Sequence, residues 1–401
     1  MSVDVLVLNT AVVDLRRPDF EFTDKLVGKG GLAKCRFEDM PKFSQEQIQQ
    51  WIEGGFATAG GPGNMAPLIA RTGLKVAVGV NLGQGRYDGL DAQGRYFHDM
   101  MTANAIDMSA THIHPTVCTG TTFIHHSPGS DRGGIAYFPN ANHDFDFAVF
   151  RKAVERLAPR IVYYMYSGLS DRGDANGGQD LADFIQWCQG QGVVTIADSH
   201  TLTGNPHKLI AEGKPVKEYR LLEPLLPELD LFFTSSDEAK LIENTLGRQP
   251  ARTDLSERAY NTHFLEFLTK RYWQDDGRTK LFGVTVSDGA YITYIGPEGQ
   301  TGGPTKVTSQ FMAGEVVDLV GAGDSFRAGL ITYIASNLDS FRKGAINFER
   351  AAQAGNLFAS LYIKAPLGDR YGHIRPYAKM LQVLQTKGGF ESFEALRQAL
   401  S

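Results

Sequence analysis

The sequence predicts an α/β protein in which helices cover both faces of a mostly parallel sheet, giving three layers. Short, continuously apolar runs alternate with longer runs of helical apolar spacing over most of the 401 residues. A parallel strand that is buried on both faces reads as an unbroken apolar run, and the helix after it returns the chain to the next strand. A composition of 42% hydrophobic and 21% charged residues is typical of a globular protein with a large core.

The expected elements follow one another along the chain. Residues 3–8 form the first predicted strand, which ends at Asn9-Thr10. Later apolar runs predict strands at residues 76–80, 160–165, 193–197, 229–234 and 281–286. Apolar residues at helical spacing predict helices at residues 65–71, 147–157, 180–189, 237–246 and 262–273, and the pattern from 325 to 401 is almost wholly helical.

Two segments break this alternation. Residues 119–126 and 133–140 are β-prone, and the Ser-Pro-Gly-Ser-Asp-Arg stretch at 127–132 predicts a hairpin turn between them. Residues 19–41 interrupt the first βα unit. We expect these segments to form a small β-rich flap beside the main sheet. The polar stretches at 204–227 and 247–256 are interpreted as surface insertions.

Charge and cysteine content exclude several classes of function. The net charge is −5, with acids and bases interspersed, so the chain offers no basic face for nucleic acid or an anionic membrane. Its three cysteines are far apart, as expected for free thiols in a reducing compartment. No apolar stretch approaches the length of a membrane span, and the N-terminus lacks the pattern of a signal peptide. We therefore expect a cytoplasmic protein.

A glycine turn in the last third of the chain is the strongest candidate for chemistry. The segment from Asp318 reads Asp-Leu-Val-Gly-Ala-Gly-Asp and leads directly into a helical pattern. Small residues at a helix start, here Gly321, Ala322 and Gly323, let several backbone N–H groups point at one anion. Asp324 could accept a hydroxyl proton while those amides stabilise charge on a transferring phosphoryl group. By itself, the segment is also consistent with a turn in which Asp324 caps the helix.

A second glycine cluster precedes the predicted helix at 65–71. It reads Gly-Gly-Pro-Gly-Asn from Gly60 to Asn64. Glycines permit close approach of the backbone to a ligand, and an asparagine amide suits a polyol, although a plain strand-to-helix turn explains the cluster equally well. Neither cluster is a Walker A sequence or a dinucleotide-binding fingerprint.

Together the two motifs resemble the signatures of the ribokinase-like, or PfkB-type, carbohydrate kinase family. The early signature includes Ala59, Asn64, Ala66, Gly73 and Gly83. The late signature runs from Asp318 through Gly321-Ala322-Gly323-Asp324 to Ala328-Gly329. The resemblance implies a three-layer ribokinase-like fold over nearly the whole chain, which we expect to form a single domain spanning residues 1–401.

The resemblance also implies the roles of individual residues. The implied sugar-binding residues are Asp14, Gly60, Gly61 and Asn64. The implied nucleotide-side residues are Ser235, Glu238, Thr285, Ser287 and Gly289. Glu238 would help hold Mg²⁺ through water, although Ser235 replaces the usual asparagine and Ser287 a usual glycine. Asp318 matches a position that helps bind a monovalent cation such as K⁺ in many relatives.

A lid and its assembly are implied in the same way. Family members cover the sugar with a β-rich lid, which excludes water from the reaction. We expect the lid here to be formed by about residues 15–52 and 112–140. Lids of this type often pair between subunits, so the resemblance raises a homodimer through the lid.

The resulting hypothesis is an ATP-dependent sugar kinase with Asp324 as catalytic base, Gly321–Gly323 as anion hole, and Mg²⁺ and ATP bound beside them. The alternatives are a nucleoside kinase of the adenosine kinase type and a non-catalytic sugar- or nucleotide-binding protein with the same fold. Two nearby features stay open. The run Tyr163-Tyr-Met-Tyr166 is expected to pack in the core with one tyrosine reaching the pocket, and Arg327 suits either a phosphate contact or a salt bridge.

Overall fold

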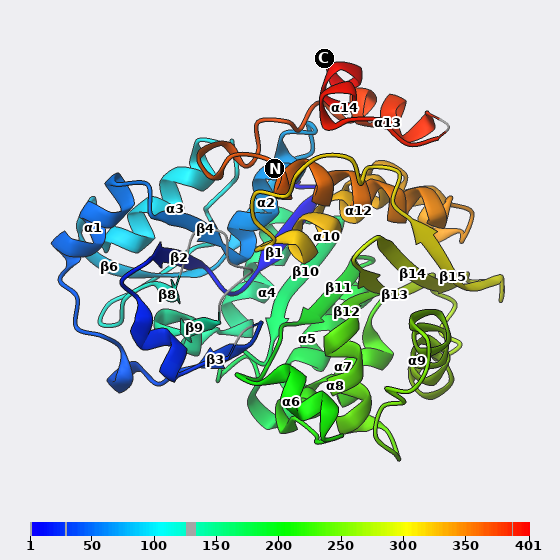
Figure 1. Ribbon diagram of the computed structural model, residues 1–401, viewed down its shortest axis with the longest axis horizontal. Helices are drawn as coiled ribbons and strands as arrows, with labels where there is room; N and C mark the ends of the chain where they lie inside the picture. The colour runs from blue at the N-terminus through cyan, green and yellow to red at the C-terminus, as the bar shows by residue number, and fades with distance from the viewer. Residues whose placement is uncertain (1, 29, 126–133, 387) are drawn as a thin grey trace.

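The computed structural model describes residues 2–28, 30–125, 134–386 and 388–401, and it confirms the predicted three-layer α/β architecture (Figure 1). An eight-stranded sheet has the order β15-β14-β13-β12-β11-β10-β1-β5. Its strands are β1 (Val5–Leu8), β5 (Val76–Gly79), β10 (Ile161–Ser167), β11 (Val194–Ser199), β12 (Leu231–Ser235), β13 (Lys280–Val286), β14 (Gly289–Ile295) and β15 (Thr301–Thr308). The six strands from β13 to β5 are parallel, and β14 and β15 extend one edge as antiparallel neighbours.

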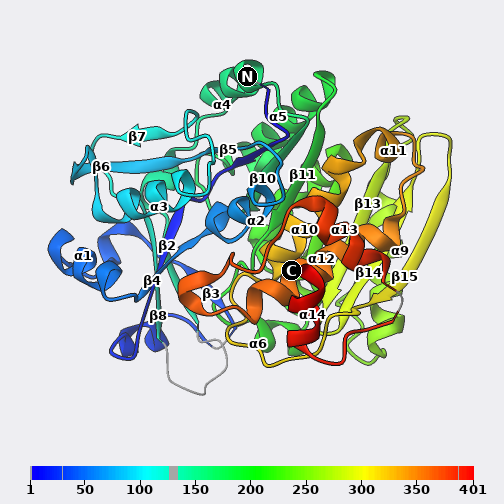
Figure 2. The same ribbon diagram turned by 90° about the horizontal axis from the view of Figure 1, so that it is seen from above.

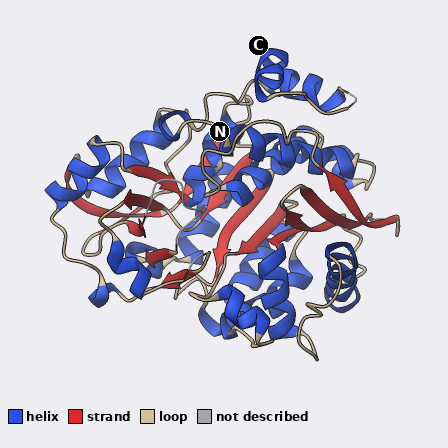
Figure 3. Cartoon of the chain, viewed as in Figure 1, coloured by secondary structure: helices blue, strands red, loops and turns tan. Residues whose placement is uncertain are grey.

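Helices cover both faces of this sheet, as Figure 1 and Figure 3 show. One face carries α2 (Ala66–Ala70), α10 (Ala322–Ser336) and α12 (Phe348–Ile363). The other carries α4 (Phe147–Leu157), α5 (Gln179–Gly190), α8 (Ser236–Leu246) and α9 (Glu257–Tyr272). Strand β1 explains why both faces need cover. Its Val5 and Val7 belong to one buried cluster and Leu6 and Leu8 to the other, because successive side chains of a strand point to opposite faces.

A five-stranded sheet lies beside the main one, with the order β3-β9-β8-β2-β4. Its strands are β2 (Val12–Arg17), β3 (Leu32–Lys34), β4 (Ala57–Gly60), β8 (Gly120–His125) and β9 (Ile135–Phe138). Both irregular segments of the sequence therefore contribute to one sheet, although the predicted turn at 127–132 lies outside the described residues. Strand β7 (His112–His114) instead pairs with β6 (Asn81–Tyr87) in a separate two-stranded sheet.

The remaining helices connect these layers. They are α1 (Gln45–Glu53), α3 (Ala92–Thr102), α6 (Pro206–Ala211), α7 (Leu222–Leu225), α11 (Leu338–Arg342), α13 (Tyr377–Gln385) and α14 (Phe393–Leu400). Short 3-10 helices are η1 (Glu21–Lys25), η2 (Phe37–Asp39), η3 (Gly61–Asn64), η4 (Asn140–Asp144), η5 (Ala175–Gly178), η6 (Lys217–Leu221), η7 (Leu226–Glu228) and η8 (Leu367–Asp369). Seen from above, α13 and α14 lie over α12 near the loop that precedes α10 (Figure 2). Over the described parts of the chain, no helix combines the length and apolar character that crossing a bilayer requires.

The interpretation of residues 204–227 as a surface insertion was wrong. This stretch contains α6, η6 and α7, and Tyr219, Leu222, Leu225 and Leu226 are buried in the cluster under one face of the main sheet. Polar residues between these positions hid the apolar pattern, because short helical turns bury only every third or fourth residue.

The carboxyl ends of β1 and β10 meet the start of α10 at one edge of the sheet, which is where open α/β sheets bind ligands. Three residues that follow or end these strands have left-handed backbones: Asn9 (φ 74°), Thr10 (φ 50°) and Tyr166 (φ 61°). Side chains other than glycine rarely adopt this conformation, and such strain gathers at functional sites. The fold thus directs attention to this edge.

Candidate active site

Two cavities adjoin at this edge. The larger is a cleft of about 620 Å³, and the smaller is a cavity of about 50 Å³ beneath the five-stranded sheet. The residues that line both are Tyr166, His200, Gly321 and Asp324. A group transferred from a ligand in the cleft to a ligand in the cavity would therefore pass beside Asp324.

The start of α10 has the geometry that the predicted anion hole requires. Gly321 is the N-cap and has a left-handed backbone (φ 86°), which aims the following N–H groups out of the helix start. The N–H of Ala322 donates to Leu319 O and that of Ser325 to Gly321 O. The N–H groups of Gly323 and Asp324 have no acceptor among the described residues. Two unpaired donors at a helix N-terminus favour an anion.

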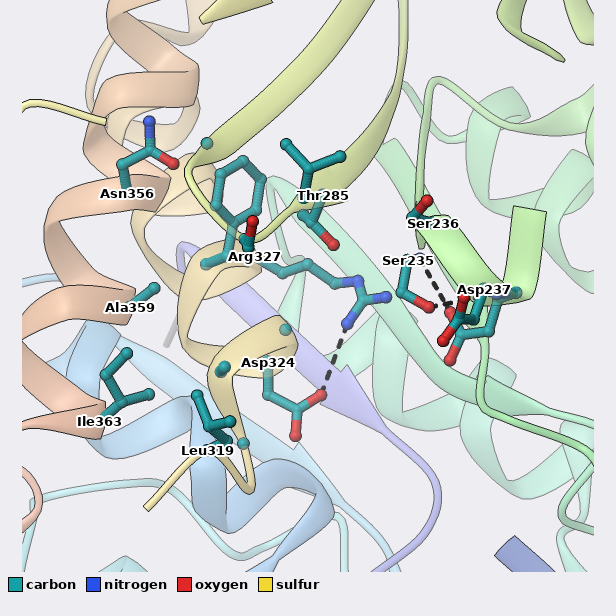
Figure 4. A pocket seen from close by; sticks show the side chains of 18 of the residues that line it. Ser235, Ser236, Asp237, Thr285, Leu319, Asp324, Arg327, Asn356, Ala359 and Ile363 are labelled. Carbon is teal, nitrogen blue, oxygen red and sulfur yellow. Dashed lines mark hydrogen bonds and ion pairs between the residues drawn. The ribbon is translucent and has the colours of Figure 1, made fainter. Parts of the chain in front are cut away.

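The two carboxylate oxygens of Asp324 have different surroundings. Oδ2 accepts hydrogen bonds from the Asn64 amide at 2.9 Å and from the Tyr166 hydroxyl at 2.6 Å. Oδ1 has one neighbouring cation, a guanidinium nitrogen of Arg327 at 3.5 Å. Figure 4 draws this ion pair as a dashed line. Oδ2 is therefore saturated by orienting donors, and Oδ1 keeps lone pairs for an incoming hydroxyl.

Tyr166 confirms the expectation that one tyrosine of its run reaches the pocket. Tyr163 and Tyr164 are fully buried in the core, whereas the Tyr166 hydroxyl contacts Asp324. Burial, with the charge of Asp324 adding to it, raises the pKa of Tyr166 well above its ordinary value. The phenol therefore stays protonated and serves as a donor.

The small cavity collects most of the predicted sugar-binding residues. Asp14, Gly61 and Asn64 line it, while Gly60 lies behind the Asp14 carboxylate, where a Cβ would approach Oδ2 to 2.8 Å. The hydroxyl of Thr122, which the sequence gave no reason to select, donates to Asp14 at 2.6 Å. Burial raises the pKa of Asp14, although the nearby Arg16 opposes this rise.

Asn64 is held by a further residue that sequence reasoning missed. Its side-chain oxygen accepts from the Tyr362 hydroxyl at 2.8 Å, and its amide donates to Asp324. Asn64 therefore orients the base, in addition to lining the cavity. Thr10 Oγ1 is buried at the same cavity without a hydrogen-bond partner in the described part of the chain, so it can bind a ligand hydroxyl.

The predicted nucleotide-side residues all line the large cleft: Ser235, Glu238, Thr285, Ser287 and Gly289. Ser235 and Glu238 form a capping box at the start of α8, in which each side chain accepts from the other's backbone N–H. Glu238 also accepts from the hydroxyls of Thr201 and Thr234. This part of the motif therefore has a structural role, whatever it contributes to a metal.

The opposite wall of the cleft carries a group of apolar side chains, beside Asn356, Ser360 and Lys364. Phe311, Met312 and Leu319 from the loop before α10 and Ala359 and Ile363 from α12 line it. Figure 4 shows Ala359, Ile363 and Leu319 on the side away from Ser235. An apolar wall facing a polar one suits a ligand with an aromatic ring and an anionic tail.

Asp318 does not face a free cation site. Guanidinium groups of Arg16 and Arg370 both contact its Oδ2. Burial by itself would raise the pKa of Asp318, but the two arginines outweigh it and leave the pKa lowered. Two fixed positive charges on one carboxylate repel a third. This arrangement argues against K⁺ bound at Asp318.

A buried carboxylate at the end of β11 completes the site. Asp198 accepts from the backbone N–H of Tyr166 at 2.8 Å, and its other oxygen lies 3.1 Å from Arg327. Burial, opposed by Arg327, raises the pKa of Asp198 to about 7. Its position at the carboxyl end of a predicted strand was the sequence signal that could have identified it.

Comparisons with known proteins agree with this geometry. Residues 284–369 match the model of the pfkB family carbohydrate kinases. The structure resembles a fructokinase with bound ATP from Xylella fastidiosa, with a TM-score of 0.61, 16% identity, and 96% of this chain and 99% of that chain covered. The fold is ribokinase-like. The resemblance predicted from the two glycine motifs is thereby confirmed.

Two adenosine kinases share this ribokinase-like fold. The enzyme from Sinorhizobium meliloti matches with a TM-score of 0.61 and 17% identity, covering 93% of this chain and 98% of that chain. The Anopheles gambiae enzyme, in complex with a di-adenosine tetraphosphate, matches with a TM-score of 0.63 and 17% identity, covering 93% and 98%. The sequence has no match among curated proteins.

Proposed function

We propose that this protein is an ATP-dependent kinase that transfers the γ-phosphate of ATP to a hydroxyl of a neutral sugar. The observation that carries the proposal is the position of Asp324. Its Oδ1 retains free lone pairs at the junction of a small polar cavity and a large cleft, beside two unpaired backbone N–H groups. A general base next to an anion hole, between two ligand sites, is what phosphoryl transfer to an alcohol requires.

In this mechanism the acceptor lies in the small cavity. Asp14, held by Thr122, binds its hydroxyl groups, and Asp324 Oδ1 takes the proton of the attacking hydroxyl. The N–H groups of Gly323 and Asp324 stabilise the charge that develops on the transferring phosphoryl group. The adenine ring packs on the apolar wall by Ala359 and Ile363, and the phosphates extend toward the start of α10.

The polar wall fits Mg²⁺. Magnesium prefers carboxylate oxygens and water, and both Asp237 and Glu238 line the cleft there. We assign Glu238 to hold the ion through water, and Ser235 and Thr285 to the phosphate side. When bound, Mg²⁺ supplies positive charge to the phosphates of ATP. Ser287 and Gly289 belong to the turn between β13 and β14, and we place them beside the nucleotide.

The charge of the small cavity favours a neutral acceptor. Among the described residues that line it, Asp14 and Asp324 are acidic and none is a lysine or arginine. A carboxylate or phosphate on the acceptor would be repelled there. A ribose hydroxyl suits the same groups, so a nucleoside is the second candidate, as the adenosine kinases of the same fold suggest.

We also propose that the chain is one kinase domain and that its five-stranded sheet acts as the lid. Leu32, Thr122, Ile135 and Tyr137 of this sheet line the small cavity, so the sheet shields the acceptor from water. Pairing of two lids would make a homodimer. A measurement of the molecular mass in solution tests this.

The test is release of ADP in the presence of Mg²⁺, measured with a panel of neutral sugars, sugar acids and adenosine. We expect turnover with a neutral sugar and none with its acidic analogues. Asp324→Asn should keep acceptor affinity but lose about two to four powers of ten in kcat. Asp180→Asn, at an acid in the first turn of α5, is the matched control and should stay active. Near-normal turnover by Asp324→Asn would refute the mechanism, and tight acceptor binding without product would indicate a binding protein.

A further inference from the structure

Two neighbours of Asp324, Tyr166 and Arg327, are held by one buried carboxylate, Asp198. Asp198 is at the end of β11 and is 1% exposed. It accepts from the backbone N–H of Tyr166, whose hydroxyl donates to Asp324 Oδ2. It also forms an ion pair with Arg327, which approaches Asp324 Oδ1. Asp198 therefore contacts one neighbour of each carboxylate oxygen of Asp324.

Arg327 is in an unusual position for an arginine. It is 7% exposed, lies one helical turn after Asp324, and shares its guanidinium between the two carboxylates. A terminal nitrogen also donates to Phe233 O of β12 at 2.9 Å, while its Nε has no hydrogen-bond partner in the described part of the chain. The side chain is thus anchored at its tip, and Figure 4 shows it extending along the cleft wall toward Asp324.

A stability role alone gives a poor account of this arrangement. A buried ion pair costs much of its attraction in desolvation, and apolar residues often replace such pairs without loss of stability. Removing only one partner is costly, because it leaves an uncompensated charge. An apolar pair could not orient the Asp324 carboxylate.

The other groups that face this pair do not replace Arg327. The charges that act on Arg327 are Asp198, Asp324 and Glu238, with the phenol of Tyr163 beside them. Asp198 experiences Arg327, Asp324 and Tyr163. Among these described groups, Arg327 is the only cation.

We propose that Arg327 and Asp198 are positioning residues for the phosphoryl transfer, which together hold the Asp324 carboxylate with Oδ1 directed at the acceptor hydroxyl. This inference rests on the proposed kinase function. Neither residue touches the acceptor in it; both act through Asp324, directly or by way of Tyr166.

The experiment compares R327M, D198N and the double variant D198N/R327M with the parent enzyme. R327M leaves two carboxylates facing each other, so we expect kcat to fall about 10- to 100-fold while the KM for the acceptor changes little. The acid limb of its pH–rate profile should move to higher pH, because Arg327 no longer opposes the rise that burial causes in the pKa of Asp198. D198N/R327M should regain thermal stability, since Asp324 no longer faces a second buried carboxylate, but its kcat should remain as low as that of R327M.

R327K separates charge from geometry. A lysine keeps the positive charge but cannot form a fork to two carboxylates. We expect its acid limb to stay at the parent's position while kcat falls. The control pair is Arg278 and Asp230, joined at 2.6 Å outside both cavities. R278M should lose stability without any change in kcat or in the pH profile.

Two results would overturn the proposal. If D198N/R327M recovers most of the parent's kcat, the pair serves only the fold. If R327M raises the KM for ATP with kcat unchanged, Arg327 binds the nucleotide instead. A measurement of thermal stability, which needs no turnover, distinguishes failure of this inference from failure of the proposed kinase function. Adding D324N to R327M removes one of the two facing carboxylates and should restore thermal stability near neutral pH, whatever the chain phosphorylates. Absence of that rescue would show that Arg327 does not hold Asp324.

Discussion

Tyr166→Phe removes one hydroxyl from the site and little else. The lost contact is a 2.6 Å hydrogen bond to the buried Asp324 Oδ2. The ring should remain in place, because it packs edge-on against His200 with centroids 4.9 Å apart and its backbone N–H donates to Asp198. A hydrogen bond to a charged group contributes about 1.5–3 kcal/mol. At about 1.4 kcal/mol for each factor of ten, kcat at neutral pH should fall about 10- to 100-fold.

The pH–rate profile shows where this energy acts. Because the hydroxyl donates to Oδ2, its loss leaves the carboxylate less firmly oriented at every pH, so kcat should be lowered across the whole profile. Raising the pH should not restore the parent's kcat. The assay is ADP release from pH 5 to 9 at saturating acceptor.

Tyr377→Phe is the matched control. Tyr377 begins helix α13 and lines neither cavity. Its hydroxyl accepts a 2.8 Å hydrogen bond from the side-chain amide of Asn337. We expect an unchanged profile for this variant. If Tyr166→Phe also keeps the parent's kcat, the Tyr166 hydroxyl does not act on Asp324, and our account of the two oxygens fails.

Three further changes test separate parts of the site. Gly321→Ala should lower the thermal midpoint and abolish turnover. Gly321 has a φ of 86°, and a Cβ there would lie 2.8 Å from a Tyr362 ring carbon. The control is Gly368→Ala, whose Cβ would meet nothing within 4 Å, and it should leave both measurements unchanged. Thr122→Val removes the donor to Asp14 and should raise the KM for the acceptor about tenfold with little change in kcat, measured by steady-state kinetics. Asp318→Asn should lower the free energy of unfolding by about 1–3 kcal/mol near neutral pH. Because the pKa of Asp318 is lowered in the folded protein, the difference in free energy of unfolding between variant and parent should shrink below about pH 4. Adding K⁺ should change the activity of the variant and the parent to the same extent.

The main sheet could be predicted because each of its parallel strands is a continuous apolar run. The helix at Phe147–Leu157 has the bounds that its apolar spacing predicts, and the parallel strands differ from prediction by at most two residues at either end. Strand β15 was missed, since Thr301–Thr308 is a polar edge strand with exposed positions. Edge strands have one unpaired side and need no apolar face, so the sequence carries no strong signal for them.

The site could be predicted only in part, for a different physical reason. Gly321 and Asp324 lie within a few residues of each other, so a local motif identifies them. Thr122, Asp198 and Tyr362 reach the site from distant parts of the chain, through Asp14, Tyr166 and Asn64 respectively. No local motif marks them, and only Asp198, which follows a predicted strand, had a positional signal. Asp14 lies on β2, a strand that the sequence did not predict, because the left-handed turn at Asn9 and Thr10 moves the chain into the second sheet.

This division between the two sheets separates affinity from chemistry. Asp14 and Thr122 belong to the five-stranded sheet, whereas Asp198 and Asp324 belong to the main sheet and the helix that packs on it. The two sets come together only around the small cavity. Because movement of the five-stranded sheet need not disturb the contacts of Asp324 with Tyr166 and Arg327, the acceptor can change while the base stays poised. Substitutions in β2 and β8 should therefore change KM and the choice of acceptor, and substitutions at the start of α10 or the end of β11 should change kcat and its pH dependence.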